Sequence, residues 1–165
     1  MQAQASFSAK IMLFGEYSIL LGSPALSIPF SYFSAGLRIP STKEDLVNPV
    51  FVESNRLLRE YYNRFLSKPG FVFNILNIEH LLDDLESGLF LDSTIPLKYG
   101  AGSSGALCAA LYSRYANDPS GQNGRIGMRE MNELRRIFAT MESWFHGKSS
   151  GLDPLVIYLR HPLII

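Results

Sequence analysis

The stretch PLKYGAGSSGALCAALY, residues 96–112, carries the residues best suited to bind an anion. Three glycines and two serines lie between Gly100 and Gly105, directly before a run that reads as an apolar helix. Glycine costs backbone entropy, so its concentration here requires either unusual dihedral angles or close approach of the backbone to another group. A glycine-rich turn before a helix offers backbone N–H groups and the positive end of the helix dipole to a phosphate.

Two interpretations of this loop stay open from its own residues. It is either a plain turn between a strand and a helix or a phosphate-binding loop. It is not a Walker A loop, because the Gly-Lys-Ser/Thr ending is absent. Ser103 or Ser104 can cap the helix that follows, and a serine hydroxyl can also ligate a Mg²⁺ held between phosphates.

Two further stretches carry charged residues that suit phosphoryl transfer. KIMLFGEYSILLGSPAL, residues 10–26, places a lysine at the head of an apolar strand and a Gly-Glu pair just after it. ESWFHGKSSGLDPLV, residues 142–156, ends a long helix with a carboxylate and sets an aspartate after a Ser-Ser-Gly turn. Phosphoryl transfer from a nucleotide needs a phosphate cradle, a divalent metal with oxygen ligands and a group that orients the nucleophile. The three stretches supply candidates for each part.

Each candidate also has a structural interpretation. Glu142 by itself fits an exposed helix position, and Asp153 fits the start of a turn. Lys10 fits a charge at a strand edge. His146 lies four residues after Glu142 and suggests a metal pair, but no further ligand motif accompanies it, so we favour a structural role for His146.

The pattern of apolar and turn residues predicts the elements that position these side chains. Strands are expected at 10–14, 25–30, 32–39, 89–97 and 155–165. Helices are expected at 52–66, 74–85, 104–115 and 128–145. Because helices and strands are mixed within a chain of one-domain length, we expect a single α+β domain.

The composition excludes several classes of protein. The 165 residues are 47% hydrophobic and 18% charged, which argues for a globular protein and against disorder. Lys plus Arg and Asp plus Glu are 15 each, so no excess positive charge indicates a nucleic-acid partner. No apolar run approaches the roughly 20 residues of a membrane span. The single cysteine, Cys108, cannot form an internal disulfide, which favours a reducing cytoplasm.

Together, the three stretches resemble motifs of the GHMP kinases, the family of galactokinase, homoserine kinase, mevalonate kinase and phosphomevalonate kinase. PLKYGAGSSGA resembles the family's Pro-x-x-x-Gly-x-Gly-Ser-Ser-Ala phosphate loop, with Gly105 where alanine is commoner. KIMLFGEYSILLGSPAL resembles the Lys-(apolar)-Gly-Glu-His stretch of mevalonate kinases, with Tyr17 in the histidine's place. GKSSGLDP resembles their Gly-x-Pro-Ser-Gly-x-Asp segment, with Ser149 replacing the proline.

The resemblance implies a fold and a set of roles. The fold is the N-terminal α+β domain of GHMP kinases, which resembles domain 2 of ribosomal protein S5. Mg²⁺ would be ligated by Ser104 and Glu142. Asp153 would take or orient the proton of the substrate hydroxyl, and Lys10 would keep Asp153 ionised and steady the charge near the transferred phosphoryl group. The ATP phosphates would lie along Gly100, Ala101, Gly102, Ser103 and Ser104.

The resemblance also suggests a reaction. It favours an ATP- and Mg²⁺-dependent kinase of a small alcohol, most similar to mevalonate kinase and acting in isoprenoid precursor synthesis, with Glu16 and Tyr17 near the substrate. Phosphomevalonate kinase or another GHMP small-molecule kinase is the alternative. A phosphorylated substrate needs extra cations, for which Lys98, Lys148 and Arg160 are candidates. The non-enzyme alternative is an inactive domain that serves as a regulatory or interaction module.

The apolar ending PLVIYLRHPLII suggests a chain interrupted within its fold, as in a fragment or a truncated product. We therefore expect residues 1–165 to be the ATP-binding N-terminal domain, without the C-terminal domain and its glycine-rich loop. A strand at 155–165 would be exposed, and the chain would self-associate through it, because an unpaired sheet edge invites pairing. These residues alone are expected to bind ATP weakly and to lack kinase activity.

Overall fold

The computed structural model describes residues 5–15, 24–97, 99–121 and 126–164. Its strands are β1 (Phe7–Phe14), β2 (Leu26–Arg38), β3 (Phe90–Ser93) and β4 (Leu163–Ile164). Its helices are α1 (Lys43–Val47), α2 (Pro49–Tyr61), the π-helix η2 (Tyr62–Leu66), α3 (Ile78–Glu86), α4 (Ser103–Tyr115), α5 (Met128–His146) and α6 (Leu152–Leu159). Helices combine with one antiparallel sheet, so the predicted α+β class is confirmed.

A single long strand, β2, pairs with all three other strands of the sheet. The prediction of two strands, at 25–30 and 32–39, is therefore wrong. Pro29 does not interrupt β2, although proline lacks a backbone N–H. Strand β3 pairs with residues 35–38 of β2, and β4 pairs with residues 26–27. Within the described residues, Pro29 is therefore paired on one side only, by β1. A proline is tolerated where a strand has one side free of a partner.

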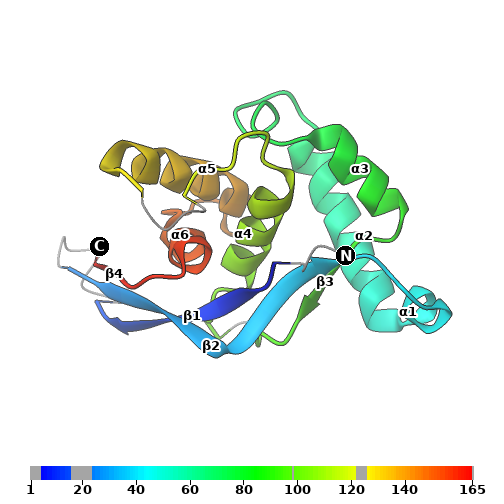
Figure 1. The fold of residues 1–165 in the computed structure, drawn as a ribbon, viewed down its shortest axis with the longest axis horizontal. Helices are drawn as coiled ribbons and strands as arrows, with labels where there is room; N and C mark the ends of the chain where they lie inside the picture. The colour runs from blue at the N-terminus through cyan, green and yellow to red at the C-terminus, as the bar shows by residue number, and fades with distance from the viewer. Residues whose placement is uncertain (1–4, 16–23, 98, 122–125, 165) are drawn as a thin grey trace.

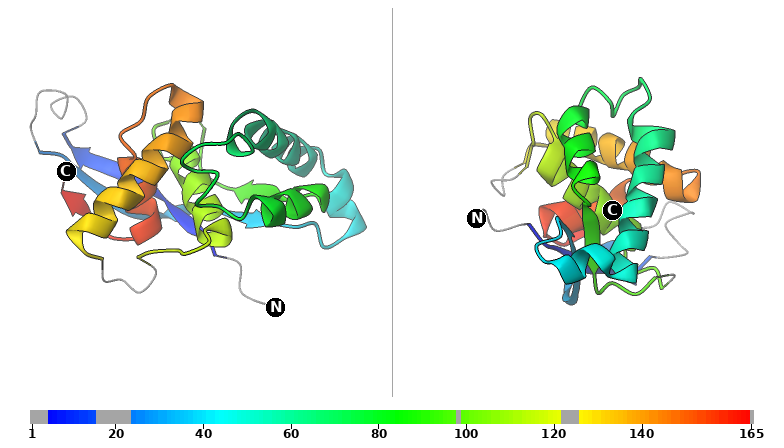
Figure 2. Two further views of the ribbon diagram at one scale, coloured as in Figure 1. Left: turned by 90° about the horizontal axis from the view of Figure 1, so that it is seen from above. Right: turned by 90° about the vertical axis from the view of Figure 1, so that its right-hand side faces the viewer.

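The helices lie in two groups on one side of the sheet (Figure 1). Helices α1, α2 and α3 gather at the end next to β3, and α4, α5 and α6 occupy the other end (Figure 2). Helix α6 lies between α5 and the sheet, and α4 beside it is buried along most of its length. Four candidate residues, Lys10, Ser104, Glu142 and Asp153, therefore lie on elements that contribute to the core. Within the described parts of the chain, no helix combines the length and the apolar character needed to cross a bilayer.

The first part of the segment 155–165 is helical, which corrects the prediction of a strand over its whole length. Helix α6 spans Leu152–Leu159, and only Leu163–Ile164 forms a strand. Val156 and Ile157 are fully buried. An apolar run fits a buried helix as well as a buried strand, so the sequence pattern did not separate them. The prediction of one exposed strand over 155–165 is therefore wrong, and self-association through the terminal residues stays a prediction.

The other predicted elements are present with shifted ends. The strands predicted at 10–14 and 89–97 are β1 and β3, and the helices predicted at 104–115 and 128–145 are α4 and α5. The helix predicted at 52–66 is α2 together with η2, and the one predicted at 74–85 is the shorter α3. Helix α3 begins only at Ile78 because Asn77 caps it: the Asn77 side chain accepts a hydrogen bond from the N–H of His80.

Candidate functional site

The glycine-rich loop is fixed to β1 and α6 at the point where α4 begins. The backbone N–H of Lys10 donates to the carbonyl oxygen of Ala101 at 3.0 Å. Gly102, the N-cap of α4, has φ 84°, a left-handed conformation that glycine adopts without strain. A Cβ atom at Gly102 would lie 2.8 Å from Cδ1 of Ile157 and 2.9 Å from Cγ of Lys10. Both the backbone angle and the close approach of neighbours therefore require glycine here.

The start of α4 presents backbone donors rather than a side-chain cap. Within the described residues, no side chain caps this helix, so the alternative that Ser103 or Ser104 does so is wrong. The first N–H groups of a helix have no partner within it and form, with the helix dipole, a favourable place for an anion. The five residues predicted to line the phosphates lie together at this point of the chain: Gly100, Ala101, Gly102, Ser103 and Ser104.

Two glycines let the first turn of α6, which carries Asp153, pack between α4 and α5. A Cβ atom at Gly105 of α4 would lie 2.9 Å from the backbone nitrogen of Pro154, which gives a steric reason for glycine where the family's loop commonly has alanine. Gly151, the N-cap of α6, has φ 72°, and a Cβ atom there would overlap the carbonyl oxygen of Arg135 in α5. Asp153 thus starts a helix rather than a turn, and its position is fixed from both sides.

Lys10 and Asp153 form an ion pair at the loop. The Nζ atom of Lys10 lies 2.9 Å from Oδ2 of Asp153. Lys10 is 7% exposed, so it is not a solvated charge at a strand edge, whereas the Asp153 side chain is 32% exposed. Burying an ammonium group costs free energy unless it is paired, and the carboxylate supplies that partner. The Asp153 side chain therefore remains partly accessible to solvent while it is paired with Lys10.

Ser104 and Glu142 meet between the start of α4 and the end of α5. The Ser104 hydroxyl donates to Oε1 of Glu142 at 3.0 Å, and the Ser149 hydroxyl donates to Oε2. Glu142 is 5% exposed, so it is not a surface residue of its helix. Ser149 stands where the family's segment has proline, and its hydroxyl makes a contact that a proline lacks.

Burial gives Glu142 an unusual protonation equilibrium. It raises the pKa of the Glu142 carboxyl, because the charged form loses its hydration. The hydrogen bonds from Ser149 and Ser104 act in the opposite direction, and the nearby charge of Asp153 raises the pKa further. Among the described residues, no lysine or arginine forms a salt bridge with Glu142. A divalent cation is the kind of partner that such a buried carboxylate suits.

The oxygen atoms of Ser104 and Glu142 fit Mg²⁺ in kind. Mg²⁺ is bound in nucleotide sites by one or two protein oxygens, with waters and substrate phosphates as the other ligands. No group of three or more His, Cys, Asp or Glu side chains in the described part of the chain is placed to hold a metal. A cation held here would therefore need further ligands from outside the protein, and phosphate oxygens at the start of α4 are suitable ones.

His146 also lies within hydrogen-bond distance of Ser104, a contact that the sequence did not predict. Its Nε2 atom lies 3.1 Å from the Ser104 hydroxyl oxygen. The available signal was the spacing of four residues between Glu142 and His146, which places both on one side of α5. As a metal pair the spacing lacks a third ligand, but in the structure the two side chains are partners of one hydroxyl.

Comparison with known proteins gives the family. Residues 56–160 match the N-terminal domain of the GHMP kinases. The chain belongs to the GHMP kinase family. The match covers the glycine-rich loop, Glu142 and Asp153, and the resemblance seen in the sequence is confirmed.

The relatives of this GHMP kinase chain include archaeal mevalonate kinases. It is 27% identical to that of Pyrococcus horikoshii over 166 residues, covering 92% of this chain and 48% of the relative. It is also 27% identical to the mevalonate kinase of Thermococcus sibiricus over 171 residues, which cover 94% of this chain and 49% of the relative. The chain spans about half the length of the curated relatives it matches.

A solved structure shares the fold. The crystal structure of mevalonate kinase from methicillin-resistant Staphylococcus aureus MRSA252 aligns with a TM-score of 0.50 at 19% sequence identity, covering 97% of this chain and 51% of that one. The predicted fold, the N-terminal α+β domain of GHMP kinases, is thereby confirmed.

The residues predicted to surround the substrate of this GHMP kinase are not all at the site. Glu16, Tyr17 and Lys98 lie outside the described residues. Lys148 is exposed just after α5. Arg160 lies at the opposite end of α6 from Asp153, where it donates to the carbonyl oxygen of Ser6 at 3.1 Å and lies over the ring of Phe7. Arg160 is therefore engaged away from the loop.

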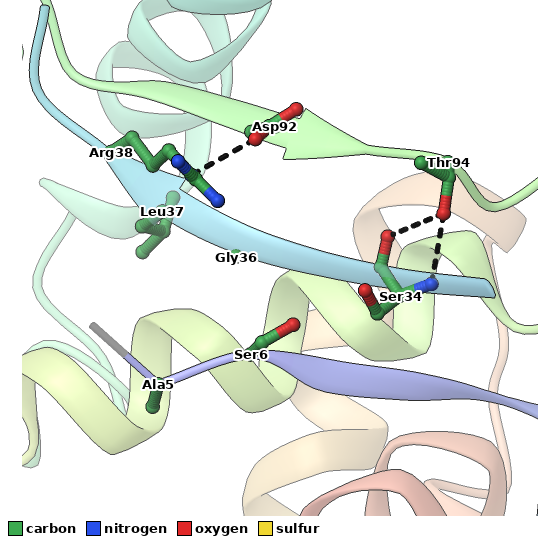
Figure 3. Close-up of a pocket in the computed structure, with 8 residues that line it drawn as sticks. All are labelled: Ala5, Ser6, Ser34, Gly36, Leu37, Arg38, Asp92 and Thr94. Carbon is green, nitrogen blue, oxygen red and sulfur yellow. Dashed lines mark hydrogen bonds and ion pairs between the residues drawn. The ribbon is translucent and has the colours of Figure 1, made fainter. Parts of the chain in front are cut away.

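Two cavities of the described structure lie apart from the three motifs. One of about 180 Å³ lies at the β2–β3 side of the sheet, where Arg38 pairs with Asp92 and Ser34 with Thr94 (Figure 3). Another, of about 430 Å³, is lined by Phe7, Ser113, Gly121, Tyr158, Leu159, Arg160 and His161. Neither cavity includes a residue predicted to bind ATP or Mg²⁺, so neither supports the nucleotide site.

Proposed function

We propose that these residues are the nucleotide-binding half of a kinase that uses ATP and Mg²⁺ to phosphorylate the hydroxyl group of a small alcohol. The observation that carries this proposal is the contact of Lys10 with Asp153 beside the glycine-rich loop. Lys10 contacts three parts of the site. Its backbone N–H donates to Ala101, its side chain packs against Gly102, and its ammonium group forms an ion pair with Asp153.

The start of α4 would bind the phosphates through its backbone. The N–H groups after Gly102 point out of the helix end, and glycine lets the phosphates approach the backbone closely. The ammonium group of Lys10 adds a positive charge on the same side of the loop. Both features act on negative charge that develops between the nucleotide and the acceptor.

Ser104 and Glu142 would hold the cation through one hydroxyl and one carboxylate oxygen. When bound, Mg²⁺ neutralises phosphate charge and orients the phosphoryl group for in-line attack. The buried position of Glu142 supports this role, because a carboxylate that pays a desolvation cost gains most from a nearby cation.

Asp153 would accept a hydrogen bond from the substrate hydroxyl and orient its oxygen toward the phosphorus. The partly exposed carboxylate is reachable from solvent, and Lys10 holds it in one orientation. A carboxylate paired in this way is a firm hydrogen-bond acceptor. It would take the hydroxyl proton as the hydroxyl oxygen bonds to phosphorus and the bond from phosphorus to the leaving ADP oxygen breaks. Because the pair sits beside the loop, the hydroxyl and the phosphates would meet at the same place.

The substrate we propose is mevalonate, as in the isoprenoid precursor pathway. The names of the relatives and the Ser-Ser-Gly-Leu-Asp segment support it. Phosphomevalonate is the second candidate, and an inactive regulatory domain is the non-enzyme alternative. The cytoplasmic location also stays a prediction. Because the relatives are about twice as long, catalysis is proposed for the whole protein, with residues 1–165 alone binding ATP weakly.

A substrate panel tests the proposal. ADP release by the full-length protein is measured with mevalonate, phosphomevalonate, homoserine and galactose at saturating MgATP. Release with mevalonate alone supports the proposed substrate, and release with phosphomevalonate alone replaces it by the second candidate. Nucleotide binding without release on any alcohol would favour the regulatory alternative. A protein that binds no nucleotide contradicts the proposal altogether.

A further inference from the structure

The Ser104 hydroxyl has two hydrogen-bonding partners within reach but only one hydrogen to donate. Its oxygen lies 3.0 Å from Oε1 of Glu142 and 3.1 Å from Nε2 of His146. A hydroxyl donates one hydrogen at a time and keeps two lone pairs. Glu142 and His146 lie one turn apart near the end of α5, so the two partners flank Ser104 from one helix.

Metal binding would change which acceptor takes the hydrogen. A hydroxyl oxygen that ligates a cation has to turn a lone pair toward it and its hydrogen away. If Oε1 of Glu142 also turns to the cation, it becomes a poor acceptor for that hydrogen, and Oε2 already accepts from Ser149. The Nε2 atom of His146 is then the acceptor that remains beside the hydroxyl.

We propose that His146 is a positioning residue of the metal site: its Nε2 atom accepts the Ser104 hydrogen and so holds a lone pair of the hydroxyl toward the cation. This inference rests on the proposed function, since it concerns the same Mg²⁺. In this arrangement the ring hydrogen of His146 is on Nδ1, and His146 is not itself a ligand. Residues that orient metal ligands typically contribute about 10- to 100-fold in metal affinity.

The surroundings allow this role to be separated from a structural one. The helix around Glu142 is held by the core, because the Tyr61 hydroxyl donates to the carbonyl oxygen of Met141 at 2.7 Å. His146 is exposed at the end of α5, so replacing it removes no core packing. Its other effect would be on the helix C-terminus, where a basic residue interacts with the dipole. That effect changes stability and leaves the orientation of Ser104 unchanged.

The test measures metal binding directly. Mn²⁺, used as a probe for Mg²⁺, is titrated into the full-length protein with ADP, and free Mn²⁺ is followed by electron paramagnetic resonance. His146→Phe keeps a planar ring without an acceptor, His146→Ala is a second variant without one, and His146→Gln keeps one. We expect His146→Phe and His146→Ala to weaken Mn²⁺ binding by about tenfold or more, and His146→Gln to stay closer to the wild type.

A double-mutant cycle identifies the partner. In a Ser104→Ala background, His146→Phe should cause no further loss, because the hydroxyl it orients is gone. The inference is overturned if His146→Phe and His146→Ala bind Mn²⁺ as the wild type does, or if the loss is the same with and without Ser104. A wild-type protein that binds no Mn²⁺ with ADP would instead overturn the proposed function.

Discussion

The ammonium group of Lys10 and the carboxylate of Asp153 lie 2.9 Å apart, but they differ in their access to solvent. Lys10 is buried and Asp153 is about one third exposed, so the two partners are not equivalent. Loss of Asp153 leaves a buried ammonium group unpaired, whereas loss of Lys10 leaves a carboxylate that water still reaches. The pair therefore suits a site in which the aspartate meets the substrate and the lysine fixes the aspartate.

The first prediction concerns Asp153. Asp153→Asn preserves the shape of the side chain but removes the charged acceptor, so kcat of the full-length protein should fall about a hundredfold or more. Nucleotide affinity should hardly change, because the phosphates are bound by the loop. ADP release and nucleotide titration measure the two quantities. Near-normal turnover would contradict the role proposed for Asp153.

The second prediction treats Lys10 and Asp153 as one unit. Lys10→Met removes the charge and keeps an unbranched apolar chain, so kcat should fall because Asp153 is no longer fixed. Groups that act together give non-additive losses. The double variant Lys10→Met/Asp153→Asn should therefore be little worse than Asp153→Asn in kcat. Losses that simply multiply would mean that the two residues act independently.

The third prediction separates backbone strain from crowding at Gly102. Gly102→Ala and Gly100→Ala both place a side chain at a positive φ, of 84° and 66°, which costs about 1–2 kcal/mol. A Cβ at Gly100 meets nothing within 4 Å, whereas one at Gly102 meets Ile157 and Lys10. Urea unfolding should show that Gly102→Ala lowers the free energy of unfolding by at least about 1 kcal/mol more than Gly100→Ala does, because overpacking typically costs this much. Equal costs would show that the loop yields without resistance.

The fourth prediction concerns the metal ligands. Ser104→Ala and Glu142→Gln each remove an oxygen ligand from a hard cation, so each should raise the Mg²⁺ concentration needed for half-maximal activity by about tenfold or more. Ser103→Ala is the matched control, because it removes a neighbouring hydroxyl and keeps the backbone N–H. A variant of Ser104 or Glu142 with wild-type Mg²⁺ dependence would remove that residue from the site.

The fifth prediction concerns stability and pH in the absence of metal. Burial raises the pKa of Glu142 in the folded protein above its ordinary value of 4.5. The unfolded chain therefore holds the charged form more easily, and ionised Glu142 lowers the free energy of unfolding at neutral pH. With EDTA present, Glu142→Gln should be more stable than the wild type at neutral pH.

This gain should fade as the pH decreases through the folded-state pKa and vanish below the ordinary value, where Glu142 is protonated in both states. Urea unfolding over this pH range measures it. A wild type that is more stable than the variant at neutral pH would contradict the prediction. A substitution that stabilises the fold while weakening metal binding is the pattern of a residue kept for function.

The sequence predicted the local features of the site better than its surroundings. Glycines at a helix start, a lysine in a strand and two carboxylates left a structural interpretation open for each residue. Their joint resemblance to the GHMP motifs singled out the loop, Lys10, Glu142 and Asp153. Their distances depend on tertiary packing, such as the contact of Gly105 with Pro154, which no local pattern contains. The roles of these residues in binding and catalysis stay predictions.

The prediction of a strand at 155–165 is wrong, although the residues just before it indicate the start of a helix. Pro154 follows Asp153 in the first turn of α6, a position that proline tolerates because the first N–H groups of a helix have no partner within it. Gly151 before it adopts a left-handed conformation and starts the helix. The Gly-Leu-Asp-Pro sequence therefore favours a helix start, although the apolar run that follows also fits a strand.

The contact between β1 and α6 also has a consequence for synthesis. Lys10 and the glycine-rich loop emerge from the ribosome well before Asp153 and Ile157, because translation proceeds from the N-terminus. Until α6 is made, the nascent chain has neither the carboxylate that pairs with the Lys10 ammonium nor the side chain that packs on Gly102. The loop that would bind a nucleotide thus reaches its final conformation late in translation, after α4 and α5 have been synthesised.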